Sequence, residues 1–446
     1  MGKRILLTVG AAVLVLSVPL LYAQHEQSQP GKQVAPAAAG AAAASWPRFT
    51  GPNYDNKSPD RGLLKSWPSG GPPLLWTYEG CGVGFSSVTI ADGLIFTAGD
   101  FDKDEKVLAL DMTGQLKWSV LNGKGWATPW PGSKSTPTYS DGMVYHLNCN
   151  GLLSAYEAKT GKQVWSYDLP REKMSQGGYA ESVLIDGNNL ICMPGSQNAF
   201  VVALNKKTGK TVWVSDFKMT GWDRASYVTG ILTERQGRKH IIHASLFQLM
   251  SLDAATGRVE WSLHHQRDQS AHCDVIACSP LRASDDSVFL SIGYGAGSQL
   301  FRIDPSGQRA SKVWRHQASD SEHAAAVLHE GLVYISGNYI YPLGGWAEKE
   351  ARQGKLYCLD VATGAEKWAQ DLCRCTLTYA DGRVYALNEF AKVHLIEPSP
   401  EKCKIVGELT IPIKGRPPTL VHPVVIGGRM YIRHQNGLYV YDVKSQ

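Results

Sequence analysis

Short runs of alternating hydrophobic and polar residues, separated by tight turns, fill most of this chain. In residues 135–169 the runs STPTYS, MVYHLN, LLSAYEA and QVWSYDL have strand length, and Asp141-Gly142 and Thr160-Gly161 separate the hairpin strands. This pattern predicts four short antiparallel strands. Glycine recurs in the turns because they require positive φ. We therefore expect an all-β protein built from four-stranded units.

The same unit recurs along the chain and closes on a tryptophan at intervals of 47 to 54 residues. The six phrases are LALDMTGQLKW ending at Trp118, SAYEAKTGKQVW at Trp165, VALNKKTGKTVW at Trp213, MSLDAATGRVEW at Trp261, FRIDPSGQRASKVW at Trp314 and YCLDVATGAEKW at Trp368. A fixed period of this size is typical of a radial β-repeat. The repeat predicts a β-propeller.

Two incomplete units give the number of blades. The seventh repeat lacks the tryptophan and puts Val406 near its position, and the last repeat ends after three strands. Far upstream, residues 72–79 (PPLLWTYE) form a lone strand with Trp76. We expect this strand to complete the C-terminal blade, which leaves no sheet edge open. The prediction is an eight-bladed β-propeller at 46–446, its ring closed by pairing of N- and C-terminal strands.

The N-terminus has a different composition. Lys3 and Arg4 precede the apolar run Ile5–Leu21, and Ala23 follows at a plausible cleavage point, so we predict a signal peptide at 1–23. An uncleaved membrane anchor is the alternative. Residues 24–45 are rich in Ala, Gln and Pro and predict a low-complexity linker. We expect a periplasmic or secreted protein.

Charge excludes one class of partner. The full chain has 45 Lys and Arg against 40 Asp and Glu, and removal of Lys3 and Arg4 leaves 43 against 40, or +3. The basic residues are scattered, so nucleic-acid binding is not expected. The nine cysteines are an odd number, so at least one is free or paired between molecules. Their pairing stays open.

The phrase L-D-x-x-T-G-x-x-x-W resembles the pyrroloquinoline quinone (PQQ) repeat of quinoprotein dehydrogenases, and equally the propeller lipoprotein of the outer-membrane β-barrel assembly machinery. WPRFTGPNYDNKS (46–58), SSVTIADGLIFTAGD (86–100) and YGAGS (294–298) are most similar to secreted bacterial PQQ-like β-propeller repeat proteins. The similarity covers about 46–446. It implies the fold but says little about a cofactor, because the repeated residues are structural.

Strand direction places the short hairpin turns on one face of the ring and the long irregular segments on the other. The long segments are 125–134, 171–179, 264–278 and 338–354. Binding residues gather on such loops. Alignment of the blades on their first turn places Lys134, Tyr179, His323 and Arg374 at the mouth of the channel, with Glu181 two residues beyond Tyr179. We predict these five as the cofactor- or ligand-binding residues, and no metal site.

Basic groups beside aromatic rings suit a flat, anionic, aromatic molecule. Two functions are consistent with such a mouth. In the first, the chain is a monomeric, non-catalytic scaffold of the cell envelope that binds such a ligand or an envelope protein. In the second, the resemblance implies a PQQ-dependent dehydrogenase of an alcohol or sugar, with Arg374 and Lys134 on the quinone and Glu181 as calcium ligand or base. We favour the scaffold because the sequence has no Cys-x-x-Cys-His haem motif and no adjacent cysteine pair. No catalytic residue is predicted for it.

Overall fold

The computed structural model describes residues 45–170, 174–219, 221, 223–265, 276–293, 295–321, 323, 325–337, 352–415 and 418–445. The chain divides into two compact units, Met1–Gly40 and Ala41–Gln446. The predicted signal peptide and almost all of the predicted linker lie outside the described residues. No described helix has the length and apolarity needed to span a membrane. Every described strand belongs to the second unit.

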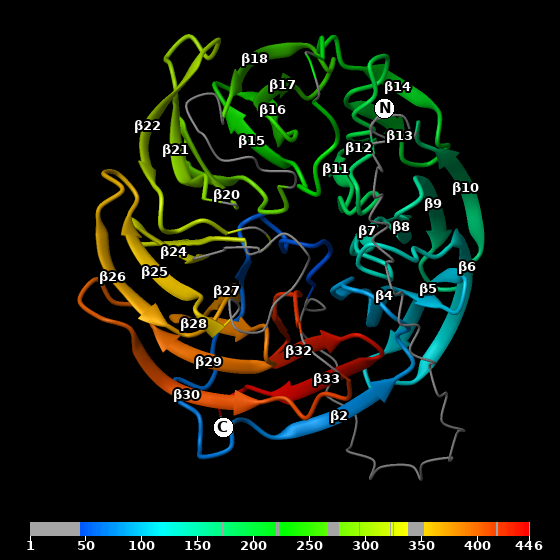
Figure 1. Cartoon of the computed structure of the whole chain (residues 1–446). Coiled ribbons are helices and arrows are strands. Elements are labelled where there is room, and N and C mark those ends of the chain that lie inside the picture. Colours follow the sequence, from blue (N-terminus) through cyan, green and yellow to red (C-terminus); the bar gives the residue numbers. More distant parts are fainter. Residues whose placement is uncertain are drawn as a thin grey trace, which may run out of the picture. The chain divides into compact units, whose positions relative to one another are not determined.

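Eight sheets form the ring, which confirms the predicted blade number (Figure 1). The first four blades contain β3 (Thr89–Ala91), β4 (Leu94–Phe101), β5 (Asp104–Asp111) and β6 (Leu116–Lys124); β7 (Thr138–Ser140), β8 (Met143–Leu147), β9 (Leu152–Glu157) and β10 (Gln163–Asp168); β11 (Leu184–Asp186), β12 (Asn189–Cys192), β13 (Val202–Asn205) and β14 (Thr211–Val214); β15 (Ile231–Arg235), β16 (Arg238–Ala244), β17 (Gln248–Asp253) and β18 (Val259–His264).

The other four blades complete the ring. They contain β19 (Leu281–Ser284), β20 (Ser287–Ile292), β21 (Gly297–Ile303) and β22 (Ala310–His316); β23 (Val327–His329), β24 (Leu332–Gly337), β25 (Lys355–Asp360) and β26 (Glu366–Asp371); β27 (Cys375–Ala380), β28 (Arg383–Asn388), β29 (Lys392–Glu397) and β30 (Lys404–Thr410), joined by β1 (Lys57–Ser58); and β31 (Val424–Ile426), β32 (Arg429–His434), β33 (Gly437–Asp442) and β2 (Leu74–Glu79).

Burial follows strand order within each blade. The second and third strands are almost continuously buried because neighbouring blades cover both of their faces, as in β8 and β9. The outermost strands expose alternate side chains, as in β10. These two patterns explain why the sequence reads as apolar runs followed by an alternating segment that carries the tryptophan.

The eighth blade takes its outer strand from the N-terminal region, as predicted. Strand β2 pairs antiparallel with β33, with Trp76 opposite Val440. A buried arginine joins this blade to the first. Arg433 donates to Ser86 O at 3.0 Å, Thr97 Oγ1 at 2.8 Å and Cys81 O at 3.2 Å. These acceptors satisfy the hydrogen-bond donors of an arginine that is 1% exposed. The eighth blade therefore joins the first blade specifically.

Five outer-strand tryptophans lie against a glycine turn of the following blade, whereas Trp368 of the sixth blade donates to Ser399 O at 2.8 Å. A Cβ added to Gly114 would lie 2.8 Å from the Trp76 ring, and one added to Gly161 would lie 2.8 Å from Trp118. Both glycines have positive φ, 86° and 74°, so glycine is required for conformation and for space. The Trp118 indole also donates to Ala158 O at 2.9 Å. The repeated residues therefore join the blades.

The seventh blade departs from this rule. Its register places Gly407, one residue beyond Val406, at the position that tryptophan takes elsewhere, opposite Leu395. Trp67 fills the space, because a Cβ on Gly407 would lie 2.6 Å from its side chain. The Trp67 and Tyr385 rings lie 5.8 Å apart, and the corresponding Tyr334 and Trp368 rings of the sixth blade lie 5.9 Å apart. An N-terminal residue thus replaces the missing tryptophan.

Residues 45–71, which we call the N-terminal strap, cross the inner ends of the blades. Tyr139 N donates to Pro47 O at 2.8 Å, and Tyr379 N to Asn56 O at 2.9 Å. The Tyr54 hydroxyl donates to Ile185 O at 3.1 Å. These contacts lie beside the first hairpin turns, so the strap covers the turn face of the channel. Figure 1 shows it in blue, passing from the centre of the ring to the rim.

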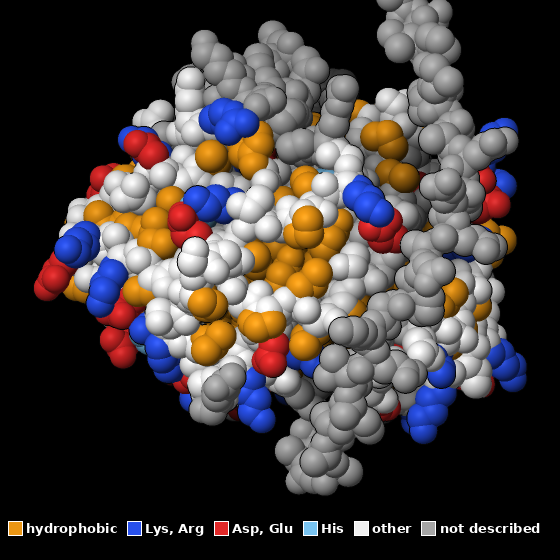
Figure 2. Space-filling view, turned by 90° about the horizontal axis from the view of Figure 1, so that it is seen from below, with side chains coloured by type: hydrophobic (Ala, Val, Ile, Leu, Met, Phe, Trp, Pro, Cys, Tyr) orange, Lys and Arg blue, Asp and Glu red, His pale blue; other side chains and the backbone are white. Residues whose placement is uncertain are grey.

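The outer strands leave some hydrophobic side chains exposed, including Leu74 at 46% and Ile405 at 38%. In Figure 2, which views the molecule from below, hydrophobic groups reach the surface among interspersed basic and acidic side chains. That view contains no continuous basic area. It agrees with the nearly balanced charge of the sequence.

Removing the strap and β2 should open the ring. A chain that starts at Cys81 loses the β2–β33 pairing and Trp67, so both the eighth and the seventh blade lose packing. We expect loss of the cooperative thermal transition shown by a chain that starts at residue 45, measured by circular dichroism. An unchanged melting temperature would contradict this closure.

Replacing Trp67 with Ala should cost about 3–5 kcal/mol, the range for a buried aromatic side chain. Chemical denaturation would measure the loss, with Trp126→Ala, a partly exposed tryptophan, as the milder control. The double variant Trp67→Gly/Gly407→Trp restores a tryptophan to the repeat position and should recover part of the stability. Equal losses in the Trp67 and Trp126 variants would contradict the replacement role.

Candidate functional site

The face opposite the strap carries the residues that precede each first strand. The chain runs from Phe85 through β3 to the turn at Asp92, so Phe85 and its equivalents in the other blades lie at the far end of the channel from the strap. Lys134 precedes β7 and Arg374 precedes β27 in the same way. We call this side the loop face. Segments 171–173, 266–275 and 338–351 of its long loops lie outside the described residues.

Lys134 is half-buried at the start of the second blade. Its ammonium lies 3.7 Å from Cys149 Sγ and 3.5 Å from Gly132 O, and 5.3 Å from the centre of the Trp126 ring. No carboxylate oxygen lies within 4 Å of it in the part of the chain that the structure describes. Burial lowers the pKa of this amine. Lys134 is therefore a cation with two long hydrogen-bonding contacts and an aromatic neighbour.

The segment 125–134 is held by a buried carboxylate. Asp100 Oδ2 accepts from Trp126 N at 2.6 Å, and the Trp126 indole donates to Pro129 O at 2.9 Å. Burial raises the pKa of Asp100 to about 6. The Trp130 and Phe85 rings meet edge to face at 6.3 Å. These contacts fix two aromatic groups beside Lys134, which alignment of the blades alone did not predict.

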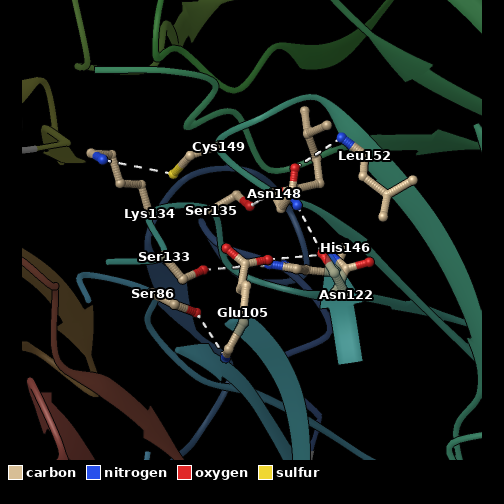
Figure 3. Close-up of polar contacts among 12 residues, drawn as sticks. Ser86, Glu105, Asn122, Ser133, Lys134, Ser135, His146, Asn148, Cys149 and Leu152 are labelled. Carbon is tan, nitrogen blue, oxygen red and sulfur yellow. Dashed lines mark hydrogen bonds and ion pairs between the residues drawn. The ribbon is translucent and has the colours of Figure 1, made fainter. Parts of the chain in front are cut away.

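Below this segment lies a network of buried polar groups (Figure 3). Glu105 Oε1 lies 2.9 Å from His146 Nε2, and Asn122 donates to the same oxygen at 3.2 Å. Ser133 Oγ lies 3.4 Å from His146 Nε2. The Lys134 ammonium points away from Glu105 and toward Cys149 in this view. The network joins the first and second blades, and among the described residues Glu105 Oε2 and His146 Nδ1 have no hydrogen-bond partner.

Glu181 and Tyr179 are deeply buried in the third blade. Glu181 is 1% exposed, and its two oxygens lie 3.0 Å from His243 Nε2 and 2.8 Å from Met193 N. Tyr179 is also 1% exposed, and its hydroxyl donates toward Pro194 O at 2.9 Å. In this conformation both residues bind protein groups. A ligand or calcium ion would have to displace those contacts.

The structure brings Arg374 and His323 together through Glu389. Arg374 donates to Glu389 Oε2 at 2.8 Å, and His323 Nε2 lies 3.4 Å from Glu389 Oε1. Burial, with Arg374 nearby, lowers the pKa of His323 to about 3, so the imidazole is neutral at physiological pH. The Arg374 side chain is 6% exposed. The positive charge that we predicted for this part of the mouth is balanced by Glu389.

The five predicted residues therefore belong to separate sets of contacts: Arg374 with His323, Glu181 with His243, Tyr179 with prolines, and Lys134 with Cys149. Among the described residues, no group of three or more His, Cys, Asp or Glu has metal-binding geometry. Sequence reasoning missed Glu389 and Trp126. A signal for Glu389 exists, because LNEFA at the end of β28 aligns with LNCNG at the end of β8.

Comparisons with known proteins agree with this architecture. A curated relative, the outer membrane protein assembly factor BamB of Yersinia pestis, is 22% identical over 320 residues, which cover 69% of this chain and 75% of the relative. The crystal structure of BamB from Moraxella catarrhalis has a TM-score of 0.60 at 15% identity, covering 83% of this chain and 99% of that one.

A dehydrogenase has the same fold, with a similar TM-score and a similarly low sequence identity. The quinohemoprotein alcohol dehydrogenase of Comamonas testosteroni has a TM-score of 0.60 at 12% identity, covering 90% of this chain and 81% of that one. At such identity the likeness concerns the fold alone. The family model described as outer membrane protein assembly factor BamB matches residues 103–370. This match spans more than half of the chain, and the chain therefore belongs to that family of PQQ-repeat propellers.

Proposed function

We propose that this protein is an exported, non-catalytic scaffold of the cell envelope that binds a partner on its loop face. The observation that carries the proposal is the difference between the two faces. The N-terminal strap covers the turn face through contacts to several blades, including those of Pro47 and Asn56. The loop face holds the irregular segments, with Val83 45% exposed beside the aromatic groups. A rigid ring with one covered face is suited to binding on the other.

The family supports an envelope protein as the partner. The relatives from Yersinia and Moraxella are named for outer membrane protein assembly or as BamB. We extend this role to the present chain as a proposal, together with the periplasmic or secreted location that the N-terminal sequence predicts. A closed propeller needs no second copy to cover an open sheet edge, so we propose a monomer.

The PQQ-dependent dehydrogenase is the second candidate, supported by the fold it shares with the quinohemoprotein alcohol dehydrogenase. Its residues do not fit the cofactor in this conformation. Glu181 is buried and each of its oxygens has a protein partner, so a calcium ion would compete with these contacts. Arg374 is paired with Glu389. A quinone carboxylate would therefore meet a balanced charge, and we derive no catalytic step through PQQ.

A photo-crosslinking residue placed on the loop face should capture the partner. Leu121 and Leu116 are a matched pair, because both lie on β6 with exposures of 57% and 47%, toward the loop face and the turn face respectively. We expect benzoylphenylalanine at Leu121 or Val83, but not at Leu116, to crosslink in living cells to one envelope protein identified by mass spectrometry. Equal yields from Leu116 and Leu121 would contradict a loop-face partner.

Titration with PQQ separates the two functions. We expect no dye-linked alcohol oxidation by the purified mature protein, with or without calcium, because Glu181 and Arg374 are engaged. Saturable PQQ binding with turnover, weakened by about 1.5–3 kcal/mol in Arg374→Ala and unaffected in Lys210→Ala near a Thr-Gly turn, would establish the dehydrogenase instead.

A further inference from the structure

The second and seventh blades each have a basic residue at the same position of the repeat, but different residues face its positive charge. Lys134 and Arg374 each lie seven residues before the Asp-Gly turn of their blade. At the ends of β8 and β28, Asn148 and Asn388 form the same turn, because each side-chain oxygen accepts from the amides two and four residues later. The following residue faces the cation, and it is Cys149 in one blade and Glu389 in the other.

The substitution leaves Lys134 without a carboxylate in hydrogen-bonding contact, and the Asp100 and Glu105 carboxylates attract it only through space. Glu389 lies 2.8 Å from Arg374 and neutralises it. Cys149 is a fully buried thiol, and burial raises its pKa to about 12, so it carries no charge at physiological pH. It lies 3.7 Å from Lys134, too far for a strong hydrogen bond. An oxyanion from outside would supply the contact that Glu389 makes internally.

The surroundings of Lys134 define what else such a ligand must have. The Trp126 ring lies 5.3 Å from the ammonium, and the residue is held by its backbone amide, which donates to Asp100, and by its indole, which donates to Pro129 O. Trp130 of the same segment meets Phe85, which precedes β3, edge to face. Rings held in place favour a flat apolar body, since little ordering accompanies binding. Cation and rings together select an aromatic anion.

We propose that Lys134, Trp126 and the adjacent Phe85–Trp130 pair form a binding site for a small aromatic carboxylate. The proposal deepens the loop-face function and rests on it. The carboxylate accepts from the Lys134 ammonium, as Glu389 accepts from Arg374, and the ring packs against Trp126. The site lies at the junction of the first and second blades, apart from the Arg374–Glu389 pair.

The probe is 2-naphthoate, with neutral 2-naphthamide of the same shape as its control. Isothermal titration of the mature protein, with tryptophan fluorescence, should show naphthoate binding at least tenfold more tightly than naphthamide. Lys134→Met keeps the apolar stem and should remove this preference, while Lys134→Arg should retain it. Trp126→Leu should weaken both probes. Lys210→Met, on the turn face, should change neither.

A reciprocal variant tests the counter-charge directly. Cys149→Glu copies the seventh blade and should abolish naphthoate binding while naphthamide binding stays, with folding checked by the thermal transition. The Lys134→Met result decides the case if the Cys149 variant does not fold. Equal naphthoate affinity in wild type and Lys134→Met, equal loss in Lys210→Met, or no binding at millimolar concentration would overturn the site. Crosslinking from Leu121 is unaffected by these outcomes, so the scaffold function is tested separately.

Discussion

Contact between an outer-strand tryptophan and the following blade joins most blades of the ring, and at five junctions the tryptophan packs against a glycine turn. Trp76 continues the series across the junction, because it lies on β2 of the eighth blade and packs against Gly114 of the first. The large ring excludes water between two sheets, and glycine is the residue that lets it approach the backbone. Arg433 adds directional hydrogen bonds at the same junction.

The gap in the series explains the course of the N-terminal strap. Gly407 leaves the seventh blade without its own ring, and Trp67 supplies one from a segment that has already crossed the turn face. The strand β2 that comes after the strap completes the eighth blade. One stretch of chain thus covers the channel, fills the seventh blade and closes the eighth. Because this stretch covers the turn face, the loop face is the one left accessible to partners.

The repeat allowed the sequence to predict the number of blades and the closing strand, because those depend on local turn chemistry and on a period. It missed Trp67, which lies outside the repeat in the turn-rich stretch KSWPSGGPP. It also placed the missing tryptophan position near Val406, one residue before Gly407, because the turn between β29 and β30 is longer: Leu395 and Gly407 are 12 residues apart, whereas Cys358 and Trp368 are 10 apart. The positions of Lys134 and Arg374 before their first strands followed from the alignment. The partners of Glu181 and Arg374 did not, because His243 and Glu389 come from strands 62 and 15 residues away.

The pairing of buried charges bears on function more than the identity of any one residue. A low-dielectric interior tolerates an ionisable group only with a partner, and this ring provides one from within at most positions: His243 for Glu181, Glu389 for Arg374, backbone carbonyls for Arg433. Groups paired in this way stabilise the scaffold, and an external ligand has to compete with their internal partners. A ligand meets less competition at a position where no internal carboxylate contacts the cation. The substitution of a thiol for a carboxylate beside Lys134 creates such a position without disturbing the repeat around it, and a propeller can therefore acquire a ligand while its blades stay the same.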